Sequence, residues 1–198
     1  MLDKTEVIKF FDRLSPSWDR NNSHDPGKIN YILDKAGIKK GVSVLDAACG
    51  TGVLFPFYLE RGAERITGID ISGGMIAEAE KKFRLPQIKL ICADIETTTF
   101  DNYFDCCVIY SAFPHFGNPT LIIEKMSKVQ QPGGRLTVAH SESIEKINSR
   151  HRQHASTVSI ELLPVKNLSE LLSPFYDVDI SLADENVFIV SGQRKKAS

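Results

Sequence analysis

Apolar residues recur every three or four positions in the first forty residues, a spacing that predicts two helices. The first spans about residues 4–14 and carries a single apolar stripe. Residues 15–25 lack this period and are expected to form a loop. The second helix lies within residues 25–37, where an Asp-Pro pair favours a helix start and a glycine favours its end. Both fall within residues 1–40, which are expected to cover a site on the rest of the domain.

Beyond residue 40, short apolar runs alternate with stretches of helical period. Strands that alternate with helices of this length predict βαβ units and a parallel sheet. Because the strands are almost continuously apolar, helices are expected to cover both faces of that sheet. The predicted strands are residues 42–46, 66–70, 88–94, 103–110 and 135–139.

The last third of the chain has a different pattern. Residues 142–154 are polar and are predicted to form a helix, and another helix is expected to begin at Asn167. Two apolar runs, 176–182 and 187–190, flank the polar residues 184–186. This arrangement is typical of an antiparallel hairpin, which would close one edge of the sheet.

Composition narrows the class of protein. The 198 residues suit one domain, 1–198, and they carry 24 basic and 25 acidic side chains. A net charge of −1 provides no general attraction for nucleic acid. No apolar run approaches the ~20 residues of a membrane span, and the amino end is too polar for a signal peptide. The four cysteines form no C-x-x-C pair and are expected to be reduced and mostly buried, which favours a cytoplasmic protein.

The most informative stretch follows the first predicted strand. Asp46 closes that strand, and Gly50-Thr51-Gly52 then leads into a helix. Glycines let the backbone turn tightly and lie against a ligand. Phe55 occupies the position of the third glycine of a dinucleotide fingerprint, which argues against a nicotinamide-dependent dehydrogenase. A carboxylate at Asp46 would repel a pyrophosphate but suits a cationic amine, such as that of S-adenosylmethionine.

Three consecutive predicted strands end in aspartate. Asp46, Asp70 and Asp94 follow one another at intervals of 24 residues. The carboxyl ends of parallel strands meet at one edge of a sheet, where open α/β sheets bind ligands. Asp70 could accept hydrogen bonds from both ribose hydroxyls of an adenosine. Asp94 could accept a hydrogen bond from the exocyclic amine of its adenine. Each aspartate alone could equally cap the helix that follows it. The prediction of a ligand site therefore rests on the three aspartates together.

These motifs together resemble class I S-adenosylmethionine-dependent methyltransferases. The resemblance covers about residues 40–140 and includes Pro132-Gly133-Gly134. Phe10-Phe11-Asp12 and Trp18-Asp19 also resemble the opening of the quinone-biosynthesis-like subgroup, which acts on small molecules. The resemblance implies an α/β, Rossmann-like, doubly wound seven-stranded sheet of order 3-2-1-4-5-7-6, with strand 7 antiparallel. The implied cofactor-binding residues are Asp46, Ala48, Cys49, Gly50, Thr51, Gly52, Asp70, Ile71, Met75, Ala93, Asp94, Ile95, Tyr110 and Ser111.

Candidate residues for the methyl acceptor follow the fourth and fifth strands. His115 and His140 are the candidate general bases, since these strands are expected to be neighbours. His151 and His154 share a helix face within residues 141–165, a probable lid segment in the family. This segment could be a solvated lid, could bind the acceptor, or could join the other histidines in a metal site; no metal ligands are assigned. The candidate acceptor-binding residues are Trp18, Phe113, Phe116, His151 and His154.

The expected function is therefore methyl transfer from S-adenosylmethionine to a small-molecule acceptor, aromatic or apolar, with S-adenosylhomocysteine as product. Ser111-Ala112-Phe113-Pro114 replaces the Asn-Pro-Pro-Tyr signature of base methylation, which also disfavours nucleic acid. A membrane partner is not expected, and the protein is expected to be a monomer or a homodimer. The alternative is a catalytically silent S-adenosylmethionine-binding module or partner subunit.

Overall fold

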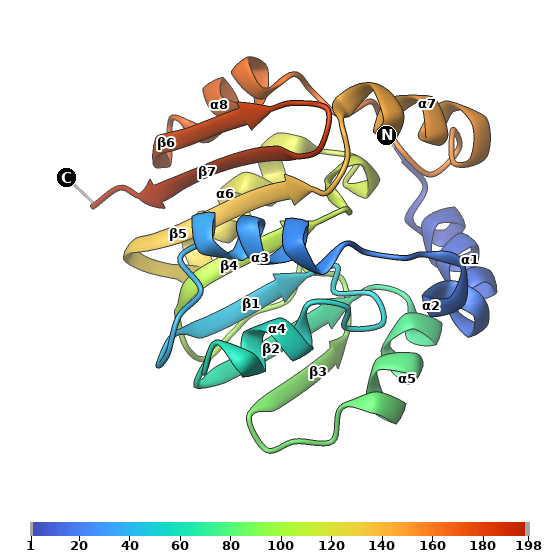
Figure 1. Cartoon of the computed structure of the whole chain (residues 1–198), viewed down its shortest axis with the longest axis horizontal. Helices are drawn as coiled ribbons and strands as arrows, with labels where there is room; N and C mark the ends of the chain where they lie inside the picture. Colours follow the sequence, from blue (N-terminus) through green and yellow to red (C-terminus); the bar gives the residue numbers. More distant parts are fainter. Residues whose placement is uncertain (1, 197–198) are drawn as a thin grey trace.

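Seven strands form one mixed sheet, as Figure 1 shows. The computed structural model describes residues 2–196. The strands are β1 (Ser43–Ala47), β2 (Arg65–Asp70), β3 (Ile88–Cys92), β4 (Phe104–Tyr110), β5 (Gln130–His140), β6 (Tyr176–Ala183) and β7 (Phe188–Arg194). Their order is β3-β2-β1-β4-β5-β7-β6, and β7 runs antiparallel to both of its neighbours. The predicted strand order and the predicted hairpin are therefore confirmed.

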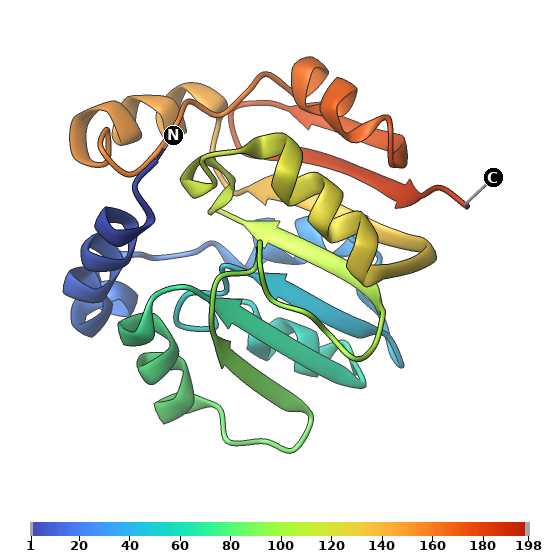
Figure 2. The same ribbon diagram turned by 180° about the vertical axis from the view of Figure 1, so that it is seen from behind.

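Helices cover both faces of the sheet. In Figure 1, α3 and α4 lie on the near face, and Figure 2 shows α6 and α8 on the opposite face. Helices α1 and α2 gather with α7 beyond the carboxyl ends of the parallel strands (Figure 1). Within residues 2–196, no helix has the length and apolar character needed to cross a membrane. The helices are α1 (Lys4–Leu14), α2 (Trp18–Asn21), α3 (Pro26–Lys35), α4 (Phe55–Glu60), α5 (Gly73–Lys82), α6 (Pro119–Val129), α7 (Ile144–His154) and α8 (Val165–Leu172), with 3-10 turns at Ser15–Ser17 and Phe113–His115.

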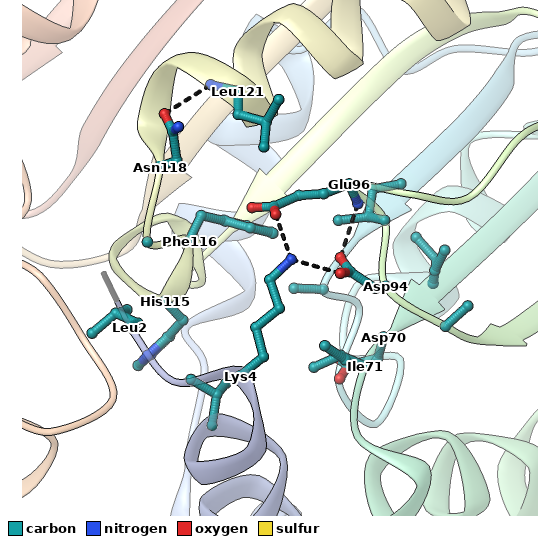
Figure 3. A pocket seen from close by; sticks show the side chains of 16 residues that line it. Leu2, Lys4, Asp70, Ile71, Asp94, Glu96, His115, Phe116, Asn118 and Leu121 are labelled. Carbon is teal, nitrogen blue, oxygen red and sulfur yellow. Dashed lines mark hydrogen bonds and ion pairs between the residues drawn. The ribbon is translucent and has the colours of Figure 1, made fainter.

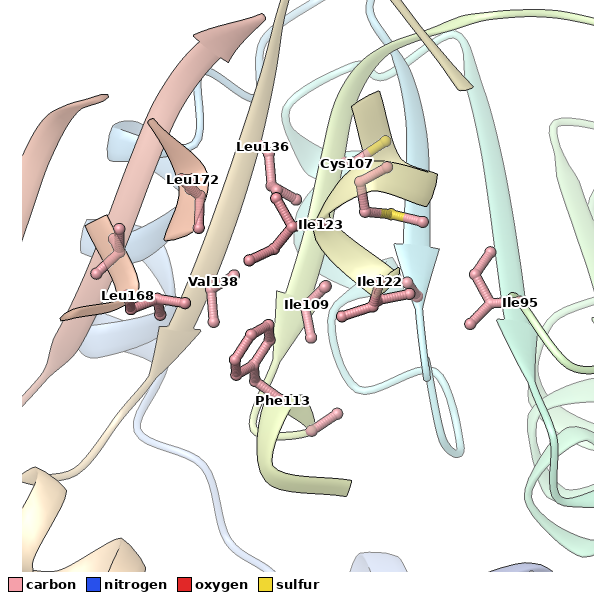
Figure 4. Packing of buried hydrophobic residues seen from close by; sticks show 14 of the residues in the cluster. Ile95, Cys107, Ile109, Phe113, Ile122, Ile123, Leu136, Val138, Leu168 and Leu172 are labelled. Carbon is pink, nitrogen blue, oxygen red and sulfur yellow. The ribbon is translucent and has the colours of Figure 1, made fainter. Parts of the chain in front are cut away.

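The core consists of two layers separated by the sheet. Alternation along β4 divides its side chains between them, because successive residues of a strand point to opposite faces. Cys106 and Val108 pack with α3 and α4, whereas Cys107 and Ile109 pack with α6 and α8. Figure 4 shows the second layer, where Ile109 and Phe113 lie among side chains of the helices. Both cysteines of the Cys106-Cys107 pair are core residues, as the sequence predicted.

Some boundaries differ from the predicted ones. Residues 15–25 are not a plain loop, because a 3-10 turn begins at Ser15 and continues into α2. The last helix begins at Val165, two residues before the predicted Asn167, with Pro164 preceding it. The strand β5 begins at Gln130, so the Pro-Gly-Gly segment lies within its irregular first half rather than before it.

The cysteine prediction is correct for three of the four residues. Cys49, Cys106 and Cys107 are buried, but Cys92 is exposed. Cys92 is the last residue of β3, an edge strand whose burial pattern is the most open of the parallel strands. An apolar run in the sequence does not distinguish an edge strand from a central one.

Candidate active site

Two main-chain amides of the turn after β1 donate hydrogen bonds to residues at the end of β2. The amide of Cys49 donates to the Ile69 carbonyl at 3.1 Å, and the amide of Gly50 donates to Asp70 Oδ2 at 2.9 Å. Gly52 has a φ of +81°, and a Cβ there would lie 2.8 Å from the Phe55 ring. Only glycine combines that φ with such close packing. The predicted glycine turn is therefore held at the carboxyl edge of the sheet.

Two other residues at this edge have positive φ without being glycine. Ala48 has φ +59° and follows β1, while Ser111 has φ +53° and follows β4, the neighbouring strand. A non-glycine residue in this region costs about 1–3 kcal/mol and tends to occur at functional sites. Both residues line the same cavity, so the backbone strain is concentrated where a ligand would bind.

Asp46 is buried below the glycine turn and does not line any of the three cavities described below. Its carboxylate is 2% exposed, and Oδ2 has no hydrogen-bond partner within residues 2–196. Burial, together with the nearby charge of Asp70, raises the pKa of Asp46 to about 7. Tyr58 lies beside it and opposes this shift without reaching hydrogen-bond geometry. A buried carboxylate without a partner is costly, so this group is suited to an incoming cation.

Asp70 lies in the wall between two cavities and is 8% exposed. Its Oδ2 accepts from Gly50, and its Oδ1 accepts from the amide of Ser72 at 2.9 Å. Burial raises the pKa of Asp70, while these amides oppose the shift. Asp70 therefore shapes the glycine turn and also presents a carboxylate to the space beside it.

The first cavity, called here the Asp94 cavity, has a volume of about 270 Å³. Figure 3 shows Lys4 reaching from α1 to Asp94 and Glu96 on the far wall. Lys4 Nζ lies 2.6 Å from Asp94 Oδ2 and also contacts the Glu96 carboxylate. Neither Lys4 nor Glu96 was predicted from the sequence as a site residue. The predicted cofactor-binding residues that line this cavity are Ala48, Asp70, Ile71, Ala93, Asp94 and Ile95.

The second cavity lies over the glycine turn and has a volume of about 110 Å³. This glycine-turn cavity shares Asp70, Ile71 and His115 with the Asp94 cavity, so the two are adjacent. Trp18 and Phe116, two of the candidate acceptor-binding residues, also line it. The predicted cofactor-binding residues that line it are Ala48, Cys49, Gly50, Thr51, Asp70, Ile71, Met75, Tyr110 and Ser111.

The third cavity, the α7 cavity, has a volume of about 230 Å³ and lies between α7 and the first two helices. It shares Phe11, Trp18 and His115 with the glycine-turn cavity. Both His151 and His154 line it, although His154 is largely exposed. The three cavities therefore adjoin along the carboxyl edge of the sheet.

His115 is the one residue common to all three cavities. Its Nδ1 lies 2.8 Å from the Val158 carbonyl, and its ring lies edge-on to Phe11 and 5.1 Å from His151. A carbonyl can only accept, so Nδ1 carries the proton and Nε2 has a free lone pair. Burial lowers the pKa of His115, which favours the neutral ring.

Two predicted residues are placed elsewhere. His140 is 2% exposed, packs edge-on against Phe188, and lines none of the three cavities. Phe113 is 1% exposed and belongs to the core layer under β4 and β5, because the 3-10 turn after β4 directs it inward. Neither residue therefore lines a cavity in which the predicted base, His140, and the predicted acceptor wall, Phe113, were expected. Within residues 2–196, no three His, Cys, Asp or Glu side chains are grouped so as to hold a metal ion.

A hydrogen-bond chain beside the glycine turn was not predicted. His24 Nδ1 lies 3.0 Å from the Tyr110 hydroxyl, which donates to Ser141 Oγ at 2.8 Å. His24 and Tyr110 both line the glycine-turn cavity. The sequence carries no signal for His24, because it lies in an aperiodic connection between two helices.

The first two helices are attached to the site by aspartates. Asp12 Oδ1 accepts from the Ser72 hydroxyl at 2.6 Å and from the Gly74 amide at 2.8 Å, at the start of α5. Asp19 Oδ1 accepts from the Thr51 hydroxyl in the glycine turn at 2.5 Å. These bonds attach α1 and α2, which lie within residues 1–40, to the glycine turn and to the start of α5. In the sequence, Phe10-Phe11-Asp12 and Trp18-Asp19 indicated this region by their resemblance to the quinone-biosynthesis-like subgroup.

Comparison with known proteins agrees with this geometry. A family model described as a methyltransferase domain matches residues 45–138. The demethylmenaquinone methyltransferase of Paenarthrobacter aurescens is 32% identical over 140 residues, which are 68% of this chain and 54% of that protein. The malonyl-[acyl-carrier protein] O-methyltransferase of Acetivibrio thermocellus is 29% identical over 139 residues, which are 69% of this chain and 49% of that protein. The match therefore spans about half the length of these relatives.

Solved structures give the same fold. The N-methyltransferase NodS from Bradyrhizobium japonicum, in complex with S-adenosylhomocysteine, aligns with a TM-score of 0.74 at 16% identity. The alignment covers 96% of this chain and 99% of that chain. By sequence and by topology, this chain belongs to the class I S-adenosylmethionine-dependent methyltransferases.

Proposed function

We propose that the protein transfers the methyl group of S-adenosylmethionine to a small-molecule acceptor with an aromatic or apolar body, leaving S-adenosylhomocysteine. The observation that carries the proposal is the row of three adjoining cavities, in which His115 borders every one. Two of them adjoin the strand-end carboxylates, and the third has an aromatic wall.

The residues present suit this cofactor. The buried carboxylate of Asp46, whose Oδ2 lacks a partner among the described residues, offers a counter-charge for a cationic amino group near the glycine turn. Asp70 is available to the ribose hydroxyls, and the Asp94 cavity offers apolar walls from Ile71 and Ile95 to a purine. When bound, the cofactor supplies a methyl group made electrophilic by its sulfonium. These residues would hold and orient it, which is a large part of catalysis for a transfer of this kind.

His115 is proposed to take the proton that the acceptor loses. The Val158 carbonyl fixes Nδ1 as the protonated nitrogen, so Nε2 is free to accept a proton. Burial lowers the pKa of His115 and keeps the ring neutral near pH 7. A positioned base of this kind contributes about 10²–10⁴-fold to a rate.

Aromatic side chains would exclude water from the acceptor. Trp18 and Phe116 both line the glycine-turn cavity, and Trp18 continues into the α7 cavity. Trp18 is also in edge contact with Phe11, at 5.7 Å between ring centroids. This wall supports an acceptor with a flat or apolar body, which buries more apolar area than a small polar molecule would.

The test measures binding first and then turnover. Calorimetry should show binding of S-adenosylhomocysteine in preference to NAD. Methyl transfer is then followed with labelled cofactor over a panel of phenols, amines and carboxylic acids. In His115→Asn, whose amide can still donate to Val158, turnover should fall by about 100-fold or more while affinity for S-adenosylhomocysteine stays within about twofold. Tight NAD binding without S-adenosylhomocysteine binding would refute the proposal, and binding without turnover on any acceptor would favour the silent module.

A further inference from the structure

The α7 cavity is apolar on one side and basic on the other. Phe10, Phe11, Leu14 and Trp18 line the side formed by the first helices. Arg150, His151 and His154 line the side formed by α7. Within the described part of the chain, the lining includes no aspartate or glutamate. An anionic group would therefore meet attraction on one wall and no repulsion from the lining.

Arg150 is the one permanent cation of this lining. Burial lowers the pKa of His24, His140 and His151, and the positive charge of Arg150 lowers each pKa further. Burial lowers the pKa of His115 and His151, which also line the cavity, so neither ring adds to the charge of Arg150 near pH 7. One cation of this kind suits a singly charged anion better than a doubly charged phosphate.

Arg150 is held at present by Glu142, which lies outside the cavity lining. The two side chains are 52% and 37% exposed, and ion pairs between exposed groups contribute only about 0–1 kcal/mol. An anion within the cavity can replace Glu142 at little cost. The planar guanidinium can then donate two parallel hydrogen bonds to a carboxylate.

His151 provides a second polar group on the same wall. Its Nδ1 is buried and has no hydrogen-bond partner in the described part of the chain. Its ring lies 5.1 Å from that of His115, the residue that also borders the other two cavities. A ligand held at Arg150 and His151 would therefore extend toward His115 along the aromatic wall.

We propose that the acceptor is a monocarboxylic acid with a flat apolar body. Its carboxylate binds Arg150 in place of Glu142, His151 completes the polar contact, and the body lies against Phe11 and Trp18. This assignment rests on the proposed function, since it concerns the acceptor side of the same site. It names the acceptor class by the group that anchors it, not by the atom that is methylated.

The test uses the single tryptophan of the chain as its probe. Trp18 lines the α7 cavity, so its fluorescence reports binding without any turnover. The paired ligands are 4-butylbenzoate and 4-butylbenzamide, which share a shape and differ in charge. The full-length protein should bind the acid about tenfold more tightly than the amide or better. Equal affinity for the two would overturn the inference.

Variants of α7 isolate the contribution of Arg150. In Arg150→Gln, affinity for the acid should fall by about tenfold while affinity for the amide stays within about twofold. Glu142→Gln should strengthen acid binding by about threefold, because it frees the guanidinium. The matched control is Arg152→Gln, since Arg152 is an exposed arginine of the same helix that pairs with Glu161 and does not line the cavity. A loss of acid binding in Arg152→Gln as large as that in Arg150→Gln would overturn the inference.

Calorimetry with S-adenosylhomocysteine on the same proteins separates this inference from the proposed function. Cofactor binding without any preference for the acid would refute the acceptor class and leave the methyltransferase proposal intact. Preference for the acid, lost only in Arg150→Gln, would support the anionic subsite even if S-adenosylhomocysteine did not bind.

Discussion

Lys4 Nζ lies 2.6 Å from Asp94 Oδ2, across ninety positions of sequence. The same ammonium group contacts Glu96, so one side chain of α1 spans the mouth of the Asp94 cavity (Figure 3). Asp94 Oδ1 accepts from the Glu96 amide at 3.0 Å, which occupies the other carboxylate oxygen. A ligand that uses Asp94 as an acceptor therefore competes with Lys4 for this carboxylate.

Removing this ammonium should speed cofactor entry. We expect Lys4→Ala to increase the association rate of S-adenosylhomocysteine by about two- to fivefold, measured by stopped-flow fluorescence of Trp18. Stability should change by less than about 1 kcal/mol, because both partners are partly exposed. Lys9→Ala is the control, since Lys9 pairs with Glu6 on the same helix without lining the cavity. Slower association in Lys4→Ala, with no change in Lys9→Ala, would contradict the prediction.

Replacing Asp70 should both lower the affinity for the cofactor and destabilise the glycine turn. Asp70→Ala removes the acceptor of the Gly50 and Ser72 amides as well as the carboxylate available to a ribose. A hydrogen bond to a charged group contributes about 1.5–3 kcal/mol, so affinity for S-adenosylhomocysteine should fall by about 100-fold or more. Calorimetry and thermal unfolding measure the two effects. A dissociation constant equal to that of the unmodified protein would show that Asp70 does not contribute to cofactor binding.

Cofactor affinity should depend on pH through Asp46. Burial raises the pKa of this carboxyl to about 7, and a cationic amine binds only its ionised form. Below that pKa the proton must leave first, so the dissociation constant of S-adenosylhomocysteine should fall as pH rises from about 5.5 to 7, by up to about tenfold per pH unit. Above about pH 7 the dependence should level off. In Asp46→Asn this dependence should disappear, and its persistence there would assign it to another group.

The pH dependence of stability should report His140. Burial lowers the pKa of His140 from 6.5 to about 3, so between these values the unfolded chain binds a proton that the folded chain does not. Stability is therefore unaffected by this group above about pH 6.5 and falls as pH decreases below it, by up to about 1.4 kcal/mol per pH unit. Urea unfolding near pH 7 and pH 5 measures the slope. His151, whose pKa is also lowered by burial, adds to this slope, and Asp46, whose pKa is raised, opposes it. His140→Gln should therefore lower the slope by up to about 1.4 kcal/mol per pH unit relative to the unmodified protein, and an unchanged slope would show that His140 does not contribute.

Much of the fold was predictable because its signals are local. Apolar runs with helical stretches between them gave the parallel strands, and the polar turn near residue 185 gave the hairpin. The aspartates at the ends of β1, β2 and β3 identified the edge that holds the cavities, because parallel strands bring their carboxyl ends together.

The differences between the expected and the observed positions of site residues have different physical causes. All of the last five residues of β5 are buried, so the sequence showed no alternation that could have indicated the direction of His140. Phe113 was misplaced because the 3-10 turn after β4 directs it into the core while His115 reaches the cavities. Lys4 and His24 were missed because their partners, Asp94 and Tyr110, are 90 and 86 positions away. Hydrophobic periodicity reports only on residues a few positions apart, so it does not indicate contacts between residues this far apart in the sequence.

The apolar cluster beneath the first helices is separate from both layers of the sheet core. Val7 packs there with Ala155 and Val158, and with the partly buried Phe10 and Phe11. The remaining attachments of these helices include the polar contacts of Lys4, Asp12 and Asp19 described above. Because this cluster is small and separate from the sheet core, we expect α1 and α2 to exchange their amide hydrogens before the central strands do.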